Sequence, residues 1–493
     1  MAMRATRRQF LRGSAAVGAG LTLPGLAACV PDAGAGAGPY RYGVASGDPD
    51  TTSVVLWTHH DPPAGTYDQV NVGWELASDP AFGTVLASGS AVAGATRDWT
   101  VKVIAGGLQP GTTYWYRFTS SAGTSPVGRT RTTPAAGVSH LRLGFVSCSN
   151  YGFGYFHAYR RLAERSDLDA VVHLGDYIYE HASAGFIGNV YGAARPLDPL
   201  NEIVSLDDYR RRYAWYHLDP DLAELHRQHP MICIWDDHEF ANDPYIGGAS
   251  NHQEALEGDW GYRVANAMRA HAEWLPTRVE DDVAYRAIPF GDLATLVLVD
   301  RQRRFLFPQP DDGDLYLGRQ QFDWLDATIA GSDTTWMLLS PQSTFGSISS
   351  SMTGGGWGDR DRARVLDAVA ASNVSNLVVT VGDVHKFRAM DVPRVPGSYS
   401  AATGAGSAAV EFAVGSVTSP GATDGSVGPQ VRYSNGSSRG YAVMDIGPTA
   451  LQMDFFGFAD ALKESATLPS DQWLAGLRTT NGAAHLVAAA APA

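Results

Sequence analysis

The chain has few cysteines for its length. Its 493 residues include three, Cys29, Cys148 and Cys233, and none of them belongs to a Cys-x-x-Cys pair of the kind that holds structural zinc. Exported domains that depend on disulfide bonds are much richer in cysteine. The sequence therefore excludes a disulfide framework, so each thiol needs its own explanation.

Acidic residues are absent from the N-terminus before Asp32. The same stretch contains Arg7 and Arg8, followed by a Gly- and Ala-rich apolar run that is too short for a stable membrane span. This pattern predicts that residues 1–28 are a signal for the twin-arginine export machinery. The run ends in Leu-Ala-Ala-Cys, which resembles a lipobox, so we expect a lipid anchor on Cys29. The alternative is a soluble product cleaved near the same place.

Basic residues are in the minority. The chain has 37 Lys and Arg against 51 Asp and Glu, and removal of residues 1–28 deletes four arginines and no acid, which leaves a net charge of −18. A chain this acidic does not attract nucleic acids or anionic membranes by its long-range field. It does supply carboxylates, which hard cations such as Ca²⁺ prefer. The composition says nothing about the oligomeric state.

The pattern of apolar residues divides the chain into segments. Residues 29–39 are small, as in a flexible linker. Residues 40–134 alternate apolar and polar positions between turn signals, which predicts a small all-β sandwich similar to fibronectin type III domains. Residues 138–480 alternate apolar strands, such as residues 141–146, with helical stretches, such as those near residues 262–274, 319–329 and 362–371. This alternation predicts a layered α/β domain with mixed β-sheets. The Ala-rich residues 481–493 are predicted to be a disordered tail.

Four apolar runs of the α/β domain lead directly into residues that can bind metal. The segments are SCSNY at 147–151, GDYIYE at 175–180, WDDHEFAN at 235–242 and GDVH at 382–385. Because the carboxyl ends of strands form the ligand-binding edge of an α/β sheet, four such endings predict one shared site. A thiol, an imidazole, carboxylates and an amide suit two unlike ions. Two adjacent ions can activate water and stabilise both oxygens of a displacement at phosphorus.

These segments resemble the signature of the alkaline phosphatase D (PhoD) family of the metallophosphatase superfamily. The likeness extends to residues 43–49, 357–364 and 411–421. The family includes phosphatases, phosphodiesterases and a phospholipase D-like branch. The resemblance implies a metallophosphatase-like fold, Fe³⁺ and Ca²⁺ as cofactors, and hydrolysis of phosphate esters by a metal-activated hydroxide. It also implies a periplasmic or cell-surface location.

The resemblance further implies a role for individual residues. The iron ligands would be Cys148, Asp176, Tyr179 and His385, with Asp176 shared with calcium. The other calcium ligands would be Asp237, Asp383 and Asn242, with Asp243 as the rival of Asn242. His238 would act on the transition state or the leaving oxygen. Asn150 and Arg301 would bind substrate, although residues 299–304 depart from the family's arginine segment.

Other residues of the same types are predicted to be structural. Cys233 and Tyr177 are expected to pack in the core, and His173 to make an internal hydrogen bond. We expect Asp383 and His385, two positions apart, to share one face of an extended segment. Histidines without a motif are expected on the surface or in helices: His157, His217, His226, His229, His252, His271 and His485.

Three functions are compatible with this sequence. The first is hydrolysis of phosphate monoesters or diesters. The second is a phospholipase D-like diesterase that acts on lipid head groups. The third is a non-catalytic cell-surface binding protein with a degenerate site. A thiol phosphatase with Cys148 as nucleophile is disfavoured, because the Arg that would close its phosphate loop is replaced by Gly154.

Overall fold

The computed structural model describes residues 38–62, 69–183, 195–279, 283–309, 312–349, 351, 356–423, 427–458 and 470–492. The described residues all belong to one compact unit. The predicted export signal, Cys29 and most of the predicted linker lie outside them. No helix in these ranges combines the length and the apolar character needed to cross a bilayer.

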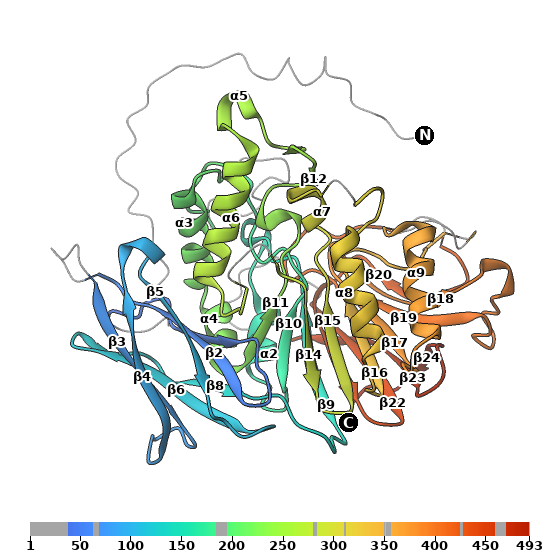
Figure 1. Ribbon diagram of the computed structural model, residues 1–493, viewed down its shortest axis with the longest axis horizontal. Helices are drawn as coiled ribbons and strands as arrows, with labels where there is room; N and C mark the ends of the chain where they lie inside the picture. The colour runs from blue at the N-terminus through green and yellow to red at the C-terminus, as the bar shows by residue number, and fades with distance from the viewer. Residues whose placement is uncertain are drawn as a thin grey trace. The chain divides into compact units, whose positions relative to one another are not determined.

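Two large β-sheets form the centre of the fold (Figure 1). The first has ten strands, in the order β24 (Val487–Ala489), β23 (Gln472–Thr480), β22 (Ala450–Phe458), β21 (Arg439–Ile446), β9 (Leu141–Val146), β10 (Ala170–His173), β11 (Pro230–Cys233), β1 (Val44–Gly47), β2 (Ser53–His59) and β5 (Thr100–Gly106). The second has seven, in the order β14 (Arg286–Phe290), β15 (Ala294–Leu298), β16 (Trp336–Ser340), β17 (Leu377–Val381), β19 (Ser407–Ala413), β18 (Phe387–Pro393) and β20 (Val431–Asn435).

Each large sheet has a parallel centre. Strands β9, β10, β11 and β1 run parallel in the first sheet, and β15, β16, β17 and β19 run parallel in the second. Antiparallel strands flank both centres, as β21 does beside β9 and β14 beside β15. These mixed sheets confirm the predicted α/β fold class.

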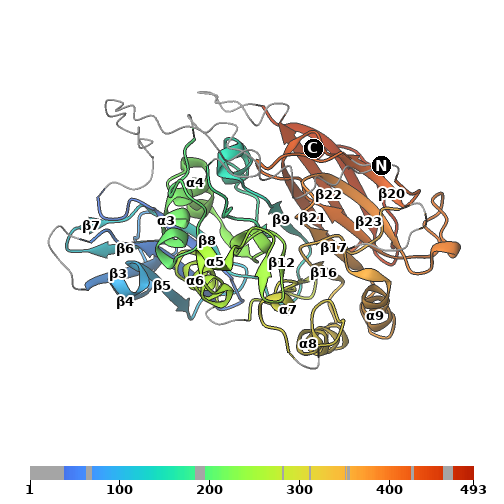
Figure 2. The same cartoon turned by 90° about the horizontal axis from the view of Figure 1, so that it is seen from above.

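The alternation of side chains along β15 shows how the second sheet is packed. Leu296 and Leu298 belong to a core cluster that also contains Phe145 of the first sheet. Val297 and Val299 point the other way, into a cluster with side chains of α8 (Arg319–Ala330) and α9 (Gly358–Ala370). Figure 2 shows these two helices on the outer side of the second sheet. The second sheet is therefore buried on both faces.

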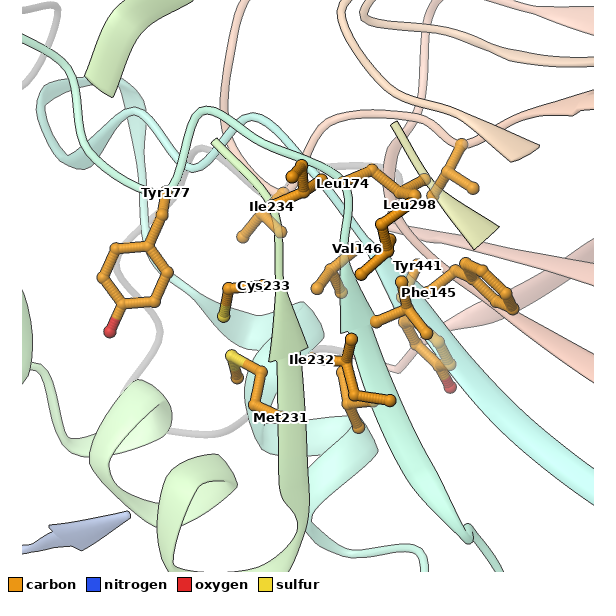
Figure 3. Close-up of a cluster of buried hydrophobic side chains, with 14 of the residues drawn as sticks. Phe145, Val146, Leu174, Tyr177, Met231, Ile232, Cys233, Ile234, Leu298 and Tyr441 are labelled. Carbon is orange, nitrogen blue, oxygen red and sulfur yellow. The ribbon is translucent and has the colours of Figure 1, made fainter. Parts of the chain in front are cut away.

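Helices also cover the first sheet. Its core cluster contains side chains of α2 (His157–Ala163), α3 (Leu206–His217), α4 (Pro220–Gln228) and α6 (Trp260–Trp274). Figure 3 shows Met231 and Cys233 on the side of β11 that faces Tyr177, with Ile232 on the opposite side. Cys233 and Tyr177 are almost fully buried. Their predicted packing role is confirmed.

The N-terminal strands form a sandwich that shares a sheet with the rest of the fold. A third sheet contains β4 (Val85–Ala93), β3 (Val70–Ala77), β6 (Thr113–Ser120), β7 (Gly123–Thr124) and β8 (Gly128–Arg131). Its core side chains Val72 and Tyr116 pack with Val44 and Leu56 of β1 and β2. Because β1 also pairs with β11, the sandwich continues into the ten-stranded sheet. A side chain at Gly47 in this junction would lie 2.3 Å from the Met231 carbonyl oxygen.

Most predicted helices and strands are present, but α3, α4, α5 (Glu254–Glu257) and α7 (Arg303–Leu306) are not anticipated by the sequence patterns. The predicted strand 141–146 is β9, and predicted helices near residues 262–274, 319–329 and 362–371 are α6, α8 and α9. Helices α3 and α4 carry capping signals that would have revealed them. The Ser205 hydroxyl accepts from the Asp208 amide, and the Asp219 carboxylate caps α4.

The prediction of a disordered C-terminal tail is wrong for residues 487–489. These form β24 and pair with β23. The preceding residues are anchored at the fully buried Asp391, whose carboxylate accepts from the Leu486 amide at 2.9 Å and contacts His485 Nδ1 at 2.6 Å. An Ala-rich composition does not show these two anchoring contacts.

Several histidines without a motif are buried, and all of them except His229 lie in helices, which is one of the two positions predicted for them. They are His157, His217, His226, His229 and His271. The Tyr177 hydroxyl lies 2.8 Å from His226 Nε2, and the Tyr159 hydroxyl lies 2.9 Å from His173 Nε2. The second contact is the internal hydrogen bond predicted for His173.

Candidate metal centre and active site

The ends of β9, β10 and β17 bring a mixed set of donor groups to one place. Ligand atoms of Cys148, Asp176 and His385 all lie within 4.8 Å of one another. The Tyr179 hydroxyl is 3.2 Å from Asp176 Oδ2 and 3.3 Å from His385 Nε2. A thiol, a carboxylate, an imidazole and a phenol therefore converge, which is a donor set suited to a transition metal.

A second group beside the first consists of acids. Ligand atoms of Asp236, Asp237 and Asp383 again lie within 4.8 Å of one another. Asp176 also forms a group with Asp237 and His238, so it connects the two sides. Oxygen donors of this kind suit a hard cation such as Ca²⁺. Asp236 has no assigned role in the sequence-based ligand set, although it lies within the WDDHEFAN segment.

Residues in the left-handed backbone region cluster at this site. A non-glycine residue held there costs about 1–3 kcal/mol and persists where the surrounding structure enforces it. The site residues with positive φ, between 48° and 62°, are Cys148, Asp176, Asp243, Gln342, Asp383 and His385. The left-handed backbone conformation at these positions therefore determines the direction in which the side chains leave the chain.

The bend after β17 separates two residues that the sequence places together. Asp383 has φ 62° and His385 has φ 52°, so the segment is not extended. Asp383 joins the acid group, whereas His385 joins the group of Cys148. The expectation that both share one face of an extended segment is therefore wrong, and the bend distributes them to the two sides of the site.

The buried carboxylates fit bound cations. Asp176 Oδ1 and Asp236 Oδ2 are buried and have no hydrogen-bond partner within the described part of the chain. Burial raises the pKa of Asp176, and the neighbouring carboxylates of Asp236 and Asp237 raise it further. Burial also raises the pKa of Asp236 to about 7, against the opposing effect of Arg301. Cations would compensate this concentration of buried negative charge.

Glu239 ties the two acid-bearing loops together. Its carboxylate accepts hydrogen bonds from the amides of Asp176 at 3.0 Å and Asp236 at 2.6 Å, and from the amide of Tyr177. The loops are in close contact, because a side chain at Gly175, which has φ 106°, would lie 2.6 Å from Asp236 Cβ. Sequence reasoning missed this role of Glu239, although the residue follows two acids of the WDDHEFAN segment.

His238 is held by a buried glutamate. Its Nδ1 lies 2.8 Å from Glu180 Oε2, and its ring centroid lies 4.2 Å from that of Tyr179. Burial opposes protonation of His238, but Glu180, Asp237 and Asp176 together raise its pKa well above the ordinary value. Glu180 closes the GDYIYE segment and is a further residue that sequence reasoning missed.

The predicted substrate-binding and amide residues have different surroundings. Arg301 lies in the site, where Nε donates to Asp236 Oδ1 at 2.7 Å and Nη2 to Asp383 Oδ1 at 3.1 Å. The Asn242 amide group donates to Ser250 Oγ and to Asp243 Oδ2. The buried Asn150 follows Cys148, and its carbonyl accepts from Thr418 Oγ1 at 2.7 Å. The functional roles of these residues stay predictions.

Ser419 supports the phenol and thiol side of the site. Its hydroxyl lies 2.7 Å from the Tyr179 hydroxyl and 3.1 Å from the Cys148 carbonyl oxygen. It belongs to the segment 411–421 that begins in β19. The segment carries the family resemblance, but only the three-dimensional contacts distinguish Ser419 within it.

A cleft of about 360 Å³ opens beside the acid group. Two larger cavities, of about 620 and 770 Å³, are lined by none of the clustered acids. The cleft therefore provides the space next to the candidate metal ligands. Its lining consists of Asp237, Asp243, Pro244, Arg301, Gln302, Phe305, Tyr316, Ser343, Thr344, Gly356 and Asp383.

Comparisons with known proteins agree with this arrangement. Residues 143–455 match the model of the PhoD-like phosphatase family, residues 26–134 match its N-terminal domain, and residues 5–24 match the twin-arginine translocation signal sequence. Alkaline phosphatase D of Bacillus subtilis (strain 168) is 34% identical over 380 residues, which cover 70% of this chain and 64% of that protein. A solved structure of PhoD superposes with a TM-score of 0.81 at 28% identity, over 92% of this chain and 93% of that chain. The family model matches well over half of the length of this chain, so this chain belongs to the PhoD-like phosphatase family.

Proposed function

We propose that this protein hydrolyses phosphate esters at a two-ion centre built on the strand ends. The observation that carries the proposal is the position of Asp176, which lies in the group of Cys148 and His385 and also in the group of Asp237 and His238. Two bound cations at such a site supply an activated water and neutralise charge on the phosphoryl oxygens.

The donor types support Fe³⁺ on one side and Ca²⁺ on the other. Cys148, Tyr179 and His385 would hold iron together with Asp176, because thiolate, phenolate and imidazole favour a transition metal. Asp237 and Asp383 would hold calcium together with Asp176. Asp236 belongs to the same acid group, whereas the Asn242 amide group donates to Ser250 and Asp243. Asp236 is therefore a further calcium ligand in this proposal.

His238 would supply the proton for the leaving ester oxygen. Glu180 occupies its Nδ1, which leaves Nε2 available for proton transfer. The surrounding carboxylates favour the protonated imidazole, as a general acid requires. Arg301 would contribute positive charge for the phosphoryl group, since it lines the cleft and its guanidinium is held in place by three acids of the site, Asp236, Asp237 and Asp383.

The test is turnover by metal-replete protein on a panel of aryl phosphate monoesters and diesters. We expect hydrolysis of at least one class and its loss in Asp176→Asn. No turnover of any ester by metal-replete protein would refute the proposal. Adding a phosphatidyl substrate to the panel separates an aryl diesterase from a lipid head-group diesterase.

We also propose that the mature protein acts outside the cytoplasm, anchored by a lipid on Cys29. The twin-arginine signal supports export, and the Leu-Ala-Ala-Cys ending supports lipidation. Mass spectrometry of the mature N-terminus tests the anchor directly. We expect a lipid-modified cysteine in the native chain and release of Cys29→Ser from the membrane fraction. An unmodified N-terminus located elsewhere would contradict lipidation.

A further inference from the structure

Two hydroxyl groups without an assigned role line the active-site cleft. Tyr316 and Ser343 lie in the same lining as Asp237, Asp383 and Arg301. The Tyr316 hydroxyl is 2.6 Å from Ser343 Oγ. When two hydroxyls bond to each other, one donates its proton and the other keeps its own for a third acceptor. This pair can therefore donate to a ligand in the cleft.

Ser343 and Thr344 form one wall of the cleft. Hydrogen bonds of the neighbouring Gln342 connect this wall to the loops that carry Arg301 and Asp383. Gln342 is fully buried, with φ 51°. Its side-chain oxygen accepts from the Arg301 amide at 3.2 Å, and its backbone carbonyl accepts from the Gly382 amide at 3.0 Å. The loop bearing Arg301, the wall at Ser343 and the loop bearing Asp383 therefore have a fixed relative position.

A buried ion pair supports the same wall from behind. Glu411 Oε2 accepts from the amides of Phe345 and Gly346, each at 2.8 Å, and Arg388 Nη2 donates to Thr344 Oγ1 at 2.8 Å. The two charged side chains are 2% exposed or less and lie 3.6 Å apart. Burying two charges carries a large desolvation cost, so the pair is better explained by the positioning of residues 344–346 than by stability alone.

We propose that Tyr316 and Ser343 form a substrate-binding pair, in which one hydroxyl donates a hydrogen bond to the phosphoryl group beside Arg301 and the other hydroxyl bonds to this donor and orients it. This inference rests on the proposed phosphate-ester hydrolysis. The aspartates of the cleft offer only acceptors when ionised, whereas a phosphoryl group needs donors. Arg301 and the remaining proton of the Tyr316–Ser343 pair supply such donors in the cleft. Burial raises the pKa of Tyr316, which keeps its phenol protonated at alkaline pH.

The test uses Tyr316→Phe and Ser343→Ala in the metal-replete enzyme, with an aryl phosphate as substrate and inorganic phosphate as inhibitor. Each variant removes either the hydroxyl that donates to the charged group or the hydroxyl that orients this donor. We therefore expect KM and the inhibition constant of phosphate to rise about tenfold or more in each case. Metal content should stay at the wild-type level. The matched controls are Tyr262→Phe on the exposed surface of α6 and Ser398→Ala, which should keep both constants.

Each outcome of this test either supports or overturns the proposed substrate-binding role of Tyr316 and Ser343. Wild-type KM and phosphate inhibition in both variants, with full metal content, would overturn the inference while leaving the hydrolysis intact. Loss of metal in either variant would also overturn it, because the hydroxyls would then act through the metal centre. If the wild type hydrolyses no ester, the proposed function fails. Direct calorimetric titration with phosphate would still show whether the two hydroxyls bind the anion.

Discussion

Glu180 Oε2 lies 2.8 Å from His238 Nδ1, and the glutamate side chain is fully buried. Its other oxygen accepts from the Asn242 amide and from Asn251 Nδ2, each at 2.8 Å. Glu180 is therefore held by three donors, and burial opposes its ionisation while the charge of His238 favours it strongly. This arrangement fixes both the position of the imidazole and its protonated nitrogen.

Removing the charge of Glu180 should impair proton donation. We expect Glu180→Gln to lower kcat on the order of a hundredfold for alkyl phosphates, whose leaving groups need a proton. The loss for p-nitrophenyl esters should be much smaller, since that leaving group is a weak base. The measurement is kcat/KM across esters of increasing leaving-group basicity. Glu75→Gln in the β-sandwich is the control, and an equal loss on all esters would contradict the role.

The two buried thiols should differ in their effect on metal binding. We expect Cys148→Ala to lower iron content at least tenfold, because it removes the only thiol near Asp176 and His385 in the described structure. Cys233→Ala should retain the metal and lose about 1 kcal/mol of stability by creating a small cavity in an apolar cluster (Figure 3). Elemental analysis and unfolding measurements distinguish the two. Equal iron content in both variants would remove Cys148 from the ligand set.

Tyr179 should give the native protein a colour. A phenolate bound to Fe³⁺ produces a visible charge-transfer band, which we expect Tyr179→Phe to abolish while most of the fold stability is retained. The hydroxyl also bonds to Ser419, so Ser419→Ala should shift the band and not remove it. Absorption spectra of protein purified without chelator provide the test. A colourless wild type with full activity would return Tyr179 to a packing role.

Removal of metal should destabilise the fold. The ionised acids Asp236, Asp237 and Asp383 repel one another when no cation lies between them. Calcium at about 100 times its dissociation constant should add about 2.7 kcal/mol to the free energy of unfolding. We expect Asp383→Asn to be less sensitive to chelator than the wild type. Thermal unfolding with and without chelator measures both effects, and overlapping wild-type curves would contradict the site.

Acid should destabilise the protein through its buried histidines. Burial lowers the pKa of His271 to about 3, from about 6.5 in the unfolded chain. Below pH 6.5 the unfolded state therefore binds a proton that the folded state does not bind, so stability falls as pH falls. Between pH 7 and pH 5 this residue alone accounts for a loss of about 2 kcal/mol.

Replacing His271 should reduce that loss. Both ring nitrogens of His271 are buried without a hydrogen-bond partner in the described part of the chain, so His271→Phe leaves no donor unpaired. We expect the decrease in unfolding free energy from pH 7 to pH 5 to be about 2 kcal/mol smaller in this variant. Urea unfolding of calcium-loaded protein at both pH values gives the result. An unchanged pH dependence in His271→Phe would contradict the assignment.

Sequence patterns predict the framework because period and local composition determine secondary structure. The apolar run Leu141–Val146 is β9, and the helical pattern from Arg319 is α8. Helices α3 and α4 escape prediction because their residues are largely polar and their apolar stripe is narrow, although Ser205 and Asp219 cap them. The tail strand β24 escapes because its anchor, Asp391, lies almost a hundred residues away.

The chemistry of the site can likewise be read from the strand ends only in part. Cys148, Asp176 and His385 are named correctly as neighbours, since each lies within four residues of the end of a buried strand. The sequence patterns do not predict the roles of Glu239, Gln342 and Glu411. These side chains form hydrogen bonds with loops that are far away in the chain, which no local pattern reveals.

The sequence by itself determined which donor types meet at the end of the parallel strands, because a strand that ends in Gly-Asp or Ser-Cys delivers those side chains to a predictable edge. Only the tertiary structure decided how the donors divide into two groups around Asp176. That division depends on left-handed bends at residues such as Asp383, and on buried carboxylates that tie separate loops together. Such contacts arise from packing and hydrogen bonding between distant segments, which no local pattern contains.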